Sequence, residues 1–498
     1  MNRDRENSIW LAFQFLFSII ISFVTLKINL IQFGDKEFGL WILLISFWGL
    51  GTILDLGFGT AIVKYTALAV RKNDEVELNH ILSTGSIFFI LFGILLVSIG
   101  IIAGNIIYFS NSKLFDKNLI DKYQRVFLIL SISFYVQYII IYLKSIFEGM
   151  NQFKLISKLG IVTNLLILVF VILIYLIRLD IIYLAFAYLT AYLILFLSYI
   201  LVIASNYNFI KIRPSNFSFY YLKKMISYSF NIQIAFFLGA LIDPLIKYLI
   251  ANFNNSSTVS YYEIARRFAM AISGLFNNSF KNLLPKASSL RNYPEFNTFL
   301  KSDVKKVASF SIFFSGLFFG ILSLPFALII KLWFGYQESI LIFFILSLAE
   351  VVNNFGFALY TFFMGIGKGV YLILIQTSNV LFVIAFLSLG FLLFQSSLGL
   401  IGYFLSVFLM NLLMIYFLKR EVTITIKSYL SEINLGKLLS LLLSTLFLII
   451  LNSLFEINIY ILTSVLSIIS VVFFYGDFKK YFFELKTMLL TVKSNRKL

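Results

Sequence analysis

The dominant feature of this sequence is a series of uninterrupted apolar runs, each about 20 residues or longer, that recurs along most of the chain. An α-helix rises about 1.5 Å per residue, so a run of this length crosses the hydrocarbon core of a bilayer. The runs show no alternation of apolar and polar residues in segments of about ten, which membrane barrels need. The sequence therefore predicts an all-α integral membrane protein. About 14 transmembrane helices are expected, at about 9–32, 39–65, 81–104, 126–148, 155–177, 181–204, 224–250, 258–284, 305–331, 338–364, 370–394, 397–418, 437–455 and 457–475.

Composition supports this class and removes several kinds of chemistry. The chain of 498 residues is 60% hydrophobic and 13% charged, whereas about 25% charged residues is usual for soluble proteins. It has one His and no Cys, which excludes disulfides and thiolate chemistry and leaves little for transition-metal sites or imidazole catalysis. The glycine-rich segment 365–369 lacks the spacing and the hydroxyl residue of a phosphate-binding loop. We expect no ATP hydrolysis, no metal and no cofactor.

The positive charge of the chain indicates its orientation in the membrane. The net charge is +17, but lysines and arginines of a membrane protein gather in cytoplasmic loops, so nucleic acid is not the expected partner. With both termini cytoplasmic, the inner loops and tails hold 26 of the 40 Lys and Arg residues and the outer loops hold seven. The apolar stretch 9–30 is longer than a typical signal peptide core and no small-residue cleavage site follows it before Phe33, so we expect a retained first helix.

The loops divide the chain into two helical halves and an extra pair of helices. Pro214 and Pro294 interrupt the longest loops, and no loop is large enough for a soluble catalytic domain. A six-plus-six arrangement of helices around a central cavity is common among transporters. The expected parts are an N-terminal lobe (1–204), a cytoplasmic linker (205–223), a C-terminal lobe (224–418), a second linker (419–436), two further transmembrane helices (437–475) and a basic cytoplasmic tail (476–498).

The run from Tyr261 to Pro285 carries an unusual number of polar residues for a membrane helix. At about 100° per residue, its polar side chains fall along one face, and apolar residues occupy the opposite face. Polar groups along one side of a membrane helix face water, protein or a charged ligand. We expect this face to line a cavity. Its members are Glu263, Arg266, Arg267, Asn277, Asn278 and Lys281.

A second charged group lies on the preceding run, where Asp243 and Lys247 are four residues apart and can form an intrahelical ion pair. Pro244 removes a backbone hydrogen bond beside them and predicts a kink. With Glu263, Arg266 and Arg267 these residues form either a neutralising structural network or a net positive site for a phosphate. Arg favours the second interpretation because its planar guanidinium matches phosphate oxygens.

Three more charged residues lie within predicted spans. Asp55 stands beside small residues, so it either bonds to a closely packed neighbouring helix or faces the cavity. Lys64 lies near the cytoplasmic end of its helix, where extension toward the membrane surface explains it as simply as ligand binding does. Glu350 is near the midplane, which favours the neutral carboxyl and is compatible with proton coupling or with a buried hydrogen-bonded acid.

Two stretches carry a resemblance to a known family. The segment 33–65 contains a glycine-bounded turn, an aromatic start and Asp55-Leu56-Gly57 before a basic residue, and the segment 259–290 contains Tyr-Tyr-Glu-Ile-Ala-Arg-Arg and closes on a proline. With the helix count, these features resemble the polysaccharide flippases (Wzx-type, O-antigen translocases) of the multidrug/oligosaccharidyl-lipid/polysaccharide exporter superfamily. The resemblance covers most of the chain.

The resemblance implies a transporter rather than an enzyme. Its substrate would be an undecaprenyl-diphosphate-linked oligosaccharide, an O-antigen or capsule or exopolysaccharide repeat unit, moved by alternating access across the bacterial inner membrane. The implied partners are membrane lipids, a coupling ion (H⁺ or Na⁺), and polysaccharide polymerase and assembly proteins. The match places Asp55, Lys64, Arg266 and Arg267 among the family's positions of interest. Two alternatives stay open: a cation-coupled multidrug exporter of the same superfamily, and a membrane glycosyltransferase or polymerase.

Overall fold

The structure is a computed structural model that describes residues 3–51, 58–110, 119–207, 209–226, 230–279, 325–365 and 369–421, together with positions 115, 319, 322 and 323. Every secondary-structure element in these residues is a helix, and eight helical stretches among them are long and apolar enough to cross a membrane. The prediction of an all-α, multi-pass membrane protein is confirmed. The predicted spans at 437–455 and 457–475 and the tail after them lie outside the described residues.

The chain divides into two compact units, Met1–Ser260 and Tyr261–Leu498. The first unit therefore includes the helix Phe230–Phe253, which the sequence-based division assigned to the C-terminal lobe (224–418). The division into two six-helix lobes itself stays a prediction.

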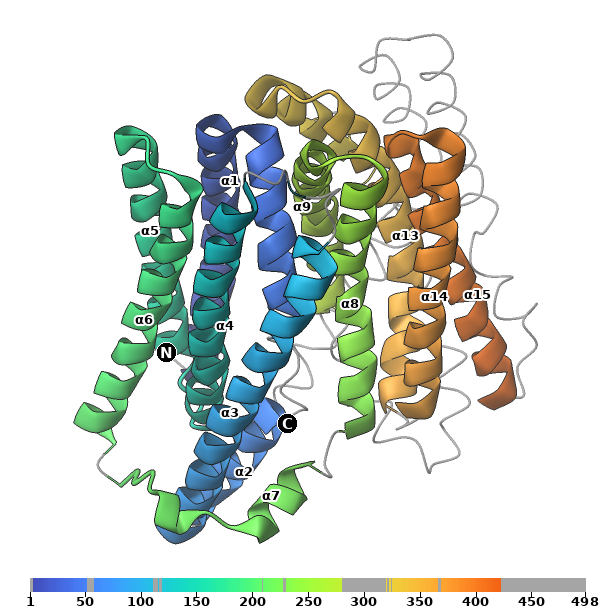
Figure 1. Ribbon diagram of the computed structural model, residues 1–498. Helices are drawn as coiled ribbons and strands as arrows, with labels where there is room; N and C mark the ends of the chain where they lie inside the picture. Colours follow the sequence, from blue (N-terminus) through green and yellow to red (C-terminus); the bar gives the residue numbers. More distant parts are fainter. Residues whose placement is uncertain are drawn as a thin grey trace. The chain divides into compact units, whose positions relative to one another are not determined.

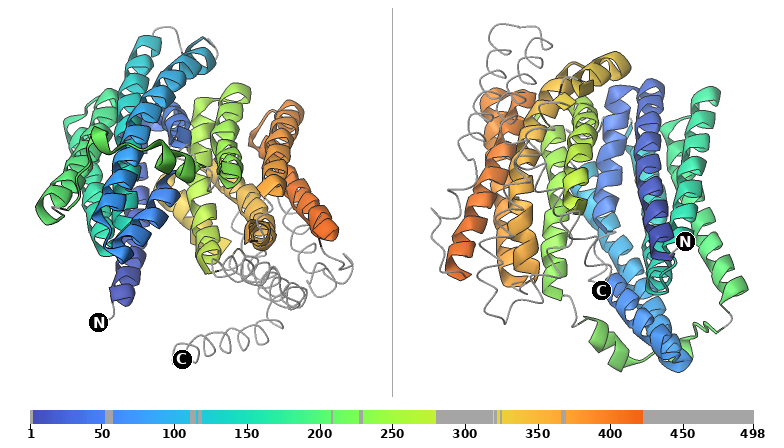
Figure 2. Two further views of the ribbon diagram at one scale, coloured as in Figure 1. Left: turned by 90° about the horizontal axis from the view of Figure 1, so that it is seen from below. Right: turned by 180° about the vertical axis from the view of Figure 1, so that it is seen from behind.

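The first unit is organised around the helix α4 (Ile120–Gly149). In Figure 1, α2, α3 and α6 pack on α4, and α5 lies beside α1 and α6. A short helix, α7, lies across the ends of α2 and α3, as the two views of Figure 2 also show. The other helices of this unit are α1 (Arg3–Gly51), α2 (Phe58–Lys72), α3 (Glu75–Gly104) with its π-helical extension η1 (Asn105–Phe109), α5 (Phe153–Ile177), α6 (Ile181–Asn206), the 3₁₀-helix η3 (Pro214–Asn216), α7 (Phe219–Ile226) and α8 (Phe230–Phe253).

The helix α1 contains two membrane-length segments joined by a sharp turn at Gly34, whose φ is 72°. This left-handed conformation suits glycine, which has no Cβ to clash with the backbone. The turn lies between the predicted spans 9–32 and 39–65, so this boundary is confirmed. The span 39–65 covers the second segment of α1 and the start of α2, and residues 52–57 between them lie outside the described part.

The turn of α1 packs closely on the beginning of α9 (Ser256–Ser279), whose first residues belong to the first unit. The Ser260 hydroxyl donates a hydrogen bond to the Asp35 carbonyl at 2.7 Å. A Cβ placed on Gly39 would lie only 1.7 Å from the Ser256 carbonyl oxygen. Gly39 therefore permits a helix-to-helix approach that no other residue allows, in the manner of small residues at membrane helix interfaces.

Of the predicted linker 205–223, residues 207 and 209–218 connect α6 to α7 and are called the linker from here on; four side chains of α3 hold this linker against that helix. Asn79 accepts a hydrogen bond from the Lys211 N–H at 2.6 Å and donates one to the Phe209 carbonyl at 3.1 Å. The Ser83 and Thr84 hydroxyls accept from the N–H groups of Arg213 and Ser218. The His80 Nδ1 lies 2.8 Å from the Asn216 carbonyl. The side chains of α3 thus satisfy the polar backbone of a segment without regular structure over most of its length.

In the second unit, α13 (Glu338–Gly365), α14 (Gly369–Phe394) and α15 (Ile401–Glu421) pack against one another, with the 3₁₀-helix η6 (Ser397–Leu400) leading into α15. The π-helix η5 (Ile330–Phe334) precedes α13. Phe268 of α9 contacts Phe334 of η5 and Phe343 of α13, with ring centroids 6.2 and 6.4 Å apart. These aromatic contacts fix one face of α9 in the apolar core of this unit.

The close approach at Gly39 gives a first prediction. We expect Gly39→Ala to lower the thermal unfolding midpoint of the purified protein, because the added methyl group forces the turn and the start of α9 apart at a cost of about 1–3 kcal/mol or more. Gly49→Ala is the matched control, since a Cβ at Gly49 would meet no atom within 4 Å. Equal midpoints for the two variants would contradict the proposed contact.

The attachment of the linker gives a second prediction. Asn79→Ala combined with Ser83→Ala should make trypsin cleave after Lys211 several-fold faster in detergent-purified protein, because each lost hydrogen bond removes about 0.5–1.5 kcal/mol of restraint. Ser98→Ala serves as the control, since the Ser98 hydroxyl bonds only to the Ile94 carbonyl of its own helix. An unchanged cleavage rate in the double variant would show that these side chains do not hold the linker.

Candidate functional site

The first charged pair lies in α8, within a membrane-spanning stretch. The Lys247 Nζ is 2.9 Å from an Asp243 carboxylate oxygen, and the lysine side chain is only 5% exposed. The i, i+4 spacing brings the two groups together without help from another helix. Pro244 lies inside the helix between them, so one backbone hydrogen bond is missing beside the pair. Burial of a lone ammonium would be costly, and the neighbouring carboxylate offsets that cost.

The second pair lies in α9. The Arg267 Nε donates to a Glu263 carboxylate oxygen at 3.0 Å, again with i, i+4 spacing. The glutamate side chain is 9% exposed and the arginine side chain 24% exposed. Arg266, the next basic residue, is half-buried. The two pairs belong to different units, and each of these contacts joins two residues of one helix.

The sequence left two interpretations of these residues open, a neutralising structural network and a phosphate site. Each acid forms an ion pair with the base four residues after it, as a neutralising network requires. A guanidinium has five N–H donors in a planar fork, however, so one bond from Nε does not exhaust its capacity to bind an anion. Both roles stay compatible with this geometry.

Lys64 lies on α2 in contact with an aromatic group. Its Nζ is 5.4 Å from the centre of the Tyr65 ring, and the Nζ of Lys224 on α7 is 4.7 Å from the same ring. Lys224 also lies 5.5 and 5.6 Å from the rings of Tyr220 and Tyr221. Stacking of ammonium groups on aromatic faces stabilises such clusters by about 0.5–1 kcal/mol per exposed contact. Lys64 therefore lies at the junction of α2 and α7, in a contact that the sequence did not suggest.

Glu350 is half-buried in α13, and the Asn353 amide donates to its carboxyl group at 3.4 Å. The i, i+3 contact agrees with the predicted polar side of this helix. The remaining predicted site residues are described only in part. Asp55 and Lys281 lie outside the described residues, and for Asn277 and Asn278 only the backbone, in α9, is described.

The hydroxyl side chains along α1 bond within the protein. The hydroxyls of Ser18, Ser22 and Thr25 each donate to a carbonyl of the preceding turn, at 2.7 to 2.9 Å. The Asn164 amide of α5 donates to the Ser18 hydroxyl at 2.7 Å. Packing of α1 on α5 thus explains these side chains without a ligand.

Sequence reasoning missed a small polar cavity inside the first unit. It is lined by Trp48 of α1, Gln137 and Ser133 of α4, and Tyr188 and Tyr192 of α6, and has a volume of about 60 Å³. The Trp48 indole is buried, and its Nε1 has no hydrogen-bond partner among the described residues. A cavity of this volume takes water molecules rather than a sugar, for which about 300 Å³ or more is usual. Only the tertiary packing of three helices brings these residues together, so no local pattern could have revealed them.

Comparison with solved structures identifies the fold. A lipid II flippase, MurJ in an inward closed conformation, is 18% identical with a TM-score of 0.65, over 95% of this chain and 100% of that chain. An inward-facing multidrug resistance MATE family transporter of the MOP superfamily is 12% identical with a TM-score of 0.63, over 84% and 96%. The Vibrio cholerae MATE transporter VcmN in the bent form is 15% identical with a TM-score of 0.55, over 86% and 98%. At these identities the likeness shows the fold alone, which is that of membrane transporters rather than of enzymes.

No curated protein matches the sequence. The family model described as polysaccharide biosynthesis protein matches residues 5–291, more than half of the chain, including all but the first four residues of the first unit and the whole of α9. The resemblance drawn from the segments 33–65 and 259–290 falls within this match. The chain therefore belongs to the polysaccharide biosynthesis protein family.

Proposed function

We propose that this protein is a flippase for an undecaprenyl-diphosphate-linked oligosaccharide, an O-antigen or capsule or exopolysaccharide repeat unit. It would carry this lipid from the cytoplasmic to the outer leaflet of the bacterial inner membrane by alternating access. The observation that carries the proposal is the match to the polysaccharide biosynthesis family on a chain with a transporter fold. A MATE-like fold alone is equally compatible with a multidrug exporter, and the family match favours the polysaccharide substrate.

The physical task explains why such a protein needs polar groups within the membrane. A sugar chain on a diphosphate cannot cross hydrocarbon unaided, because each unsatisfied polar group costs several kcal/mol there. A cavity with cationic side chains on its wall removes this barrier, while the polyprenyl tail stays in the lipid. We assign Arg266, Arg267, Lys281, Asn277, Asn278, Lys247 and Lys64 to this wall. Glu350, Asp55, Asp243 and Glu263 are assigned to ion coupling or charge balance.

The pair in α9 offers a way to bind and release the diphosphate. In the absence of substrate, Glu263 neutralises Arg267 within one helix, which lowers the cost of burying the guanidinium. An incoming diphosphate competes with this carboxylate for the N–H groups of Arg267. Because the exchange replaces one charge-assisted contact by another, binding does not become so strong that release fails.

The role of Arg267 gives a third prediction. Arg267→Gln should reduce surface glycan at least about tenfold at unchanged protein level, since a charge-assisted hydrogen bond contributes about 1.5–3 kcal/mol. Surface glycan is measured by immunoblot or flow cytometry on a deletion strain complemented with each variant. The strain should also accumulate lipid-linked oligosaccharide on the cytoplasmic leaflet. Arg125→Ala, at an exposed position of α4, is the control and should export normally.

A double variant separates binding from charge balance. If Arg267 binds the diphosphate, Glu263→Gln combined with Arg267→Gln stays as deficient as Arg267→Gln alone. If Arg267 serves only to neutralise Glu263, the double variant regains export, because no charge is left unbalanced. Recovery of normal glycan would therefore refute the binding role while leaving the flippase function intact.

Glu350 gives a fourth prediction, which concerns coupling to protons. In reconstituted vesicles, Glu350→Gln should flatten the dependence of transport on external pH, because glutamine cannot take up or lose a proton. Asn353→Ala, which keeps the carboxyl group and removes its 3.4 Å contact, should retain the pH dependence. A wild-type pH profile in the glutamine variant would exclude Glu350 as the coupling residue.

A further inference from the structure

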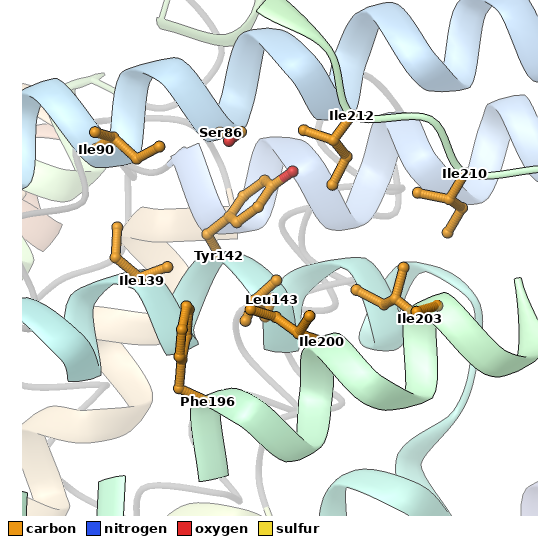
Figure 3. A pocket seen from close by; sticks show the side chains of 11 residues that line it. Ser86, Ile90, Ile139, Tyr142, Leu143, Phe196, Ile200, Ile203, Ile210 and Ile212 are labelled. Carbon is orange, nitrogen blue, oxygen red and sulfur yellow. The ribbon is translucent and has the colours of Figure 1, made fainter. Parts of the chain in front are cut away.

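A cavity of about 370 Å³ lies in the first unit, apart from the charged pairs of α8 and α9. Figure 3 shows Ile90 of α3 and Ile212 of the linker facing Phe196 of α6 across it. Ser86 and Tyr142 are its only lining residues with polar side chains, and the Tyr142 hydroxyl already donates to the Leu82 carbonyl at 2.8 Å. The wall is therefore apolar. Its volume falls in the range of about 300–1,000 Å³ that is usual for small-molecule sites.

The packing of the helices explains why this space is not filled. The helices α3 and α6 both pack on α4 and flank it, and the cavity lies over α4 between them. Ile90 and Ile200 on its two sides are 41% and 40% exposed, so the cavity opens on the surface of the unit. This surface belongs to membrane-spanning stretches, so the surrounding medium is the hydrocarbon of the bilayer.

The linker forms one end of the cavity and places positive charge there. Ile210 and Ile212 line the cavity, while the side chains of Lys211 and Arg213, which alternate with them, are exposed. Lys211 and Arg213 are not part of the cavity wall, and their exposed side chains extend beside the two isoleucines at this end of the cavity. Because α6 ends at Asn206, the linker follows directly on a membrane-spanning helix and lies at headgroup level. Glu77, in the first turn of α3, pairs with Lys72, whose Nζ is 3.4 Å from its carboxylate.

We propose that this cavity binds one anionic membrane phospholipid, with an acyl chain in the apolar space and the phosphate at Lys211 and Arg213. The apolar wall matches the chain, and the two basic side chains match the phosphate at the depth where headgroups lie. The much longer undecaprenyl chain would extend well beyond a cavity of about 370 Å³, whereas this volume suits a single acyl chain, so a bilayer lipid is the proposed occupant. The hydrogen bonds from α3 keep the linker in place, so they preserve both parts of the site.

The full-length protein is placed in nanodiscs that contain phosphatidylethanolamine and phosphatidylglycerol at three to one. Native mass spectrometry then measures the lipid that the protein retains after its release from the nanodiscs. The wild type should retain one phosphatidylglycerol. Two variants fill the cavity from opposite walls, Ser86→Phe in α3 and Ala204→Trp in α6, and each should lower this retention at least about tenfold. The thermal unfolding midpoint of each variant, measured without lipid, shows whether that variant folds. If one variant does not fold, the lipid retention of the other variant tests the proposal.

Removal of the charge tests the headgroup separately. Lys211→Ala combined with Arg213→Ala should abolish the preference for phosphatidylglycerol over phosphatidylethanolamine. This variant keeps the linker in place, because Asn79 and Ser83 bind the backbone N–H groups of these residues and not their side chains. Lys419→Ala with Arg420→Ala, an exposed basic pair at the end of α15, is the matched control and should retain the preference.

Three results would overturn the proposal. These are wild-type retention in a folded cavity-filling variant, an unchanged preference in the Lys211 and Arg213 variant, and displacement of the retained phosphatidylglycerol by equimolar undecaprenyl phosphate. The last result would assign the cavity to the polyprenyl carrier instead.

Discussion

Hydrocarbon offers no hydrogen bonds and little stabilisation of charge, and most polar contacts of this protein follow from that constraint. Lys247 and Arg267 each have an acid one helical turn away, so neither base needs a partner from another helix. The hydroxyls of α1 donate to carbonyls of their own helix. These bases and hydroxyls thus have a partner in their own helix, which is in place as soon as the helix forms.

The same constraint determines where the chain departs from helix. The turn at Gly34 lies between two membrane-length segments, and its Asp35 carbonyl accepts a hydrogen bond from Ser260. The linker is irregular apart from η3, and Asn79, Ser83 and Thr84 bind its backbone. Irregular backbone is tolerated where side chains replace the hydrogen bonds that a helix would make. The polar residues near the start of α3 therefore supply hydrogen bonds to the backbone of a segment 130 residues away in sequence.

These examples also show what could be predicted from sequence. Apolar runs of spanning length predict the helices, because a bilayer allows few other structures. The i, i+4 spacing predicts the contact of Asp243 with Lys247, because the helix alone brings these two residues together. The attachment of the linker to α3 and the cavity around Trp48 depend on which helices pack together. The predicted grouping of both charged pairs at one cavity depends on how helices far apart in the sequence pack together, and it remains a proposal.

The intrahelical pairs differ in one respect from the ion pairs that join helices. Lys122 of α4 lies 3.2 Å from Glu37 of α1 and 3.1 Å from Asp180, which caps the start of α6, so this lysine links three helices of the first unit. Movement of these helices against one another would break that network, which favours their moving as one body. In α8 and α9, by contrast, the contacts of Lys247 with Asp243 and of Arg267 with Glu263 join residues of one helix. In the proposed alternating access, the network at Lys122 would keep the unit rigid. The acids four residues before Lys247 and Arg267 would balance the charge of these bases, and at Arg267 a diphosphate would compete with the acid.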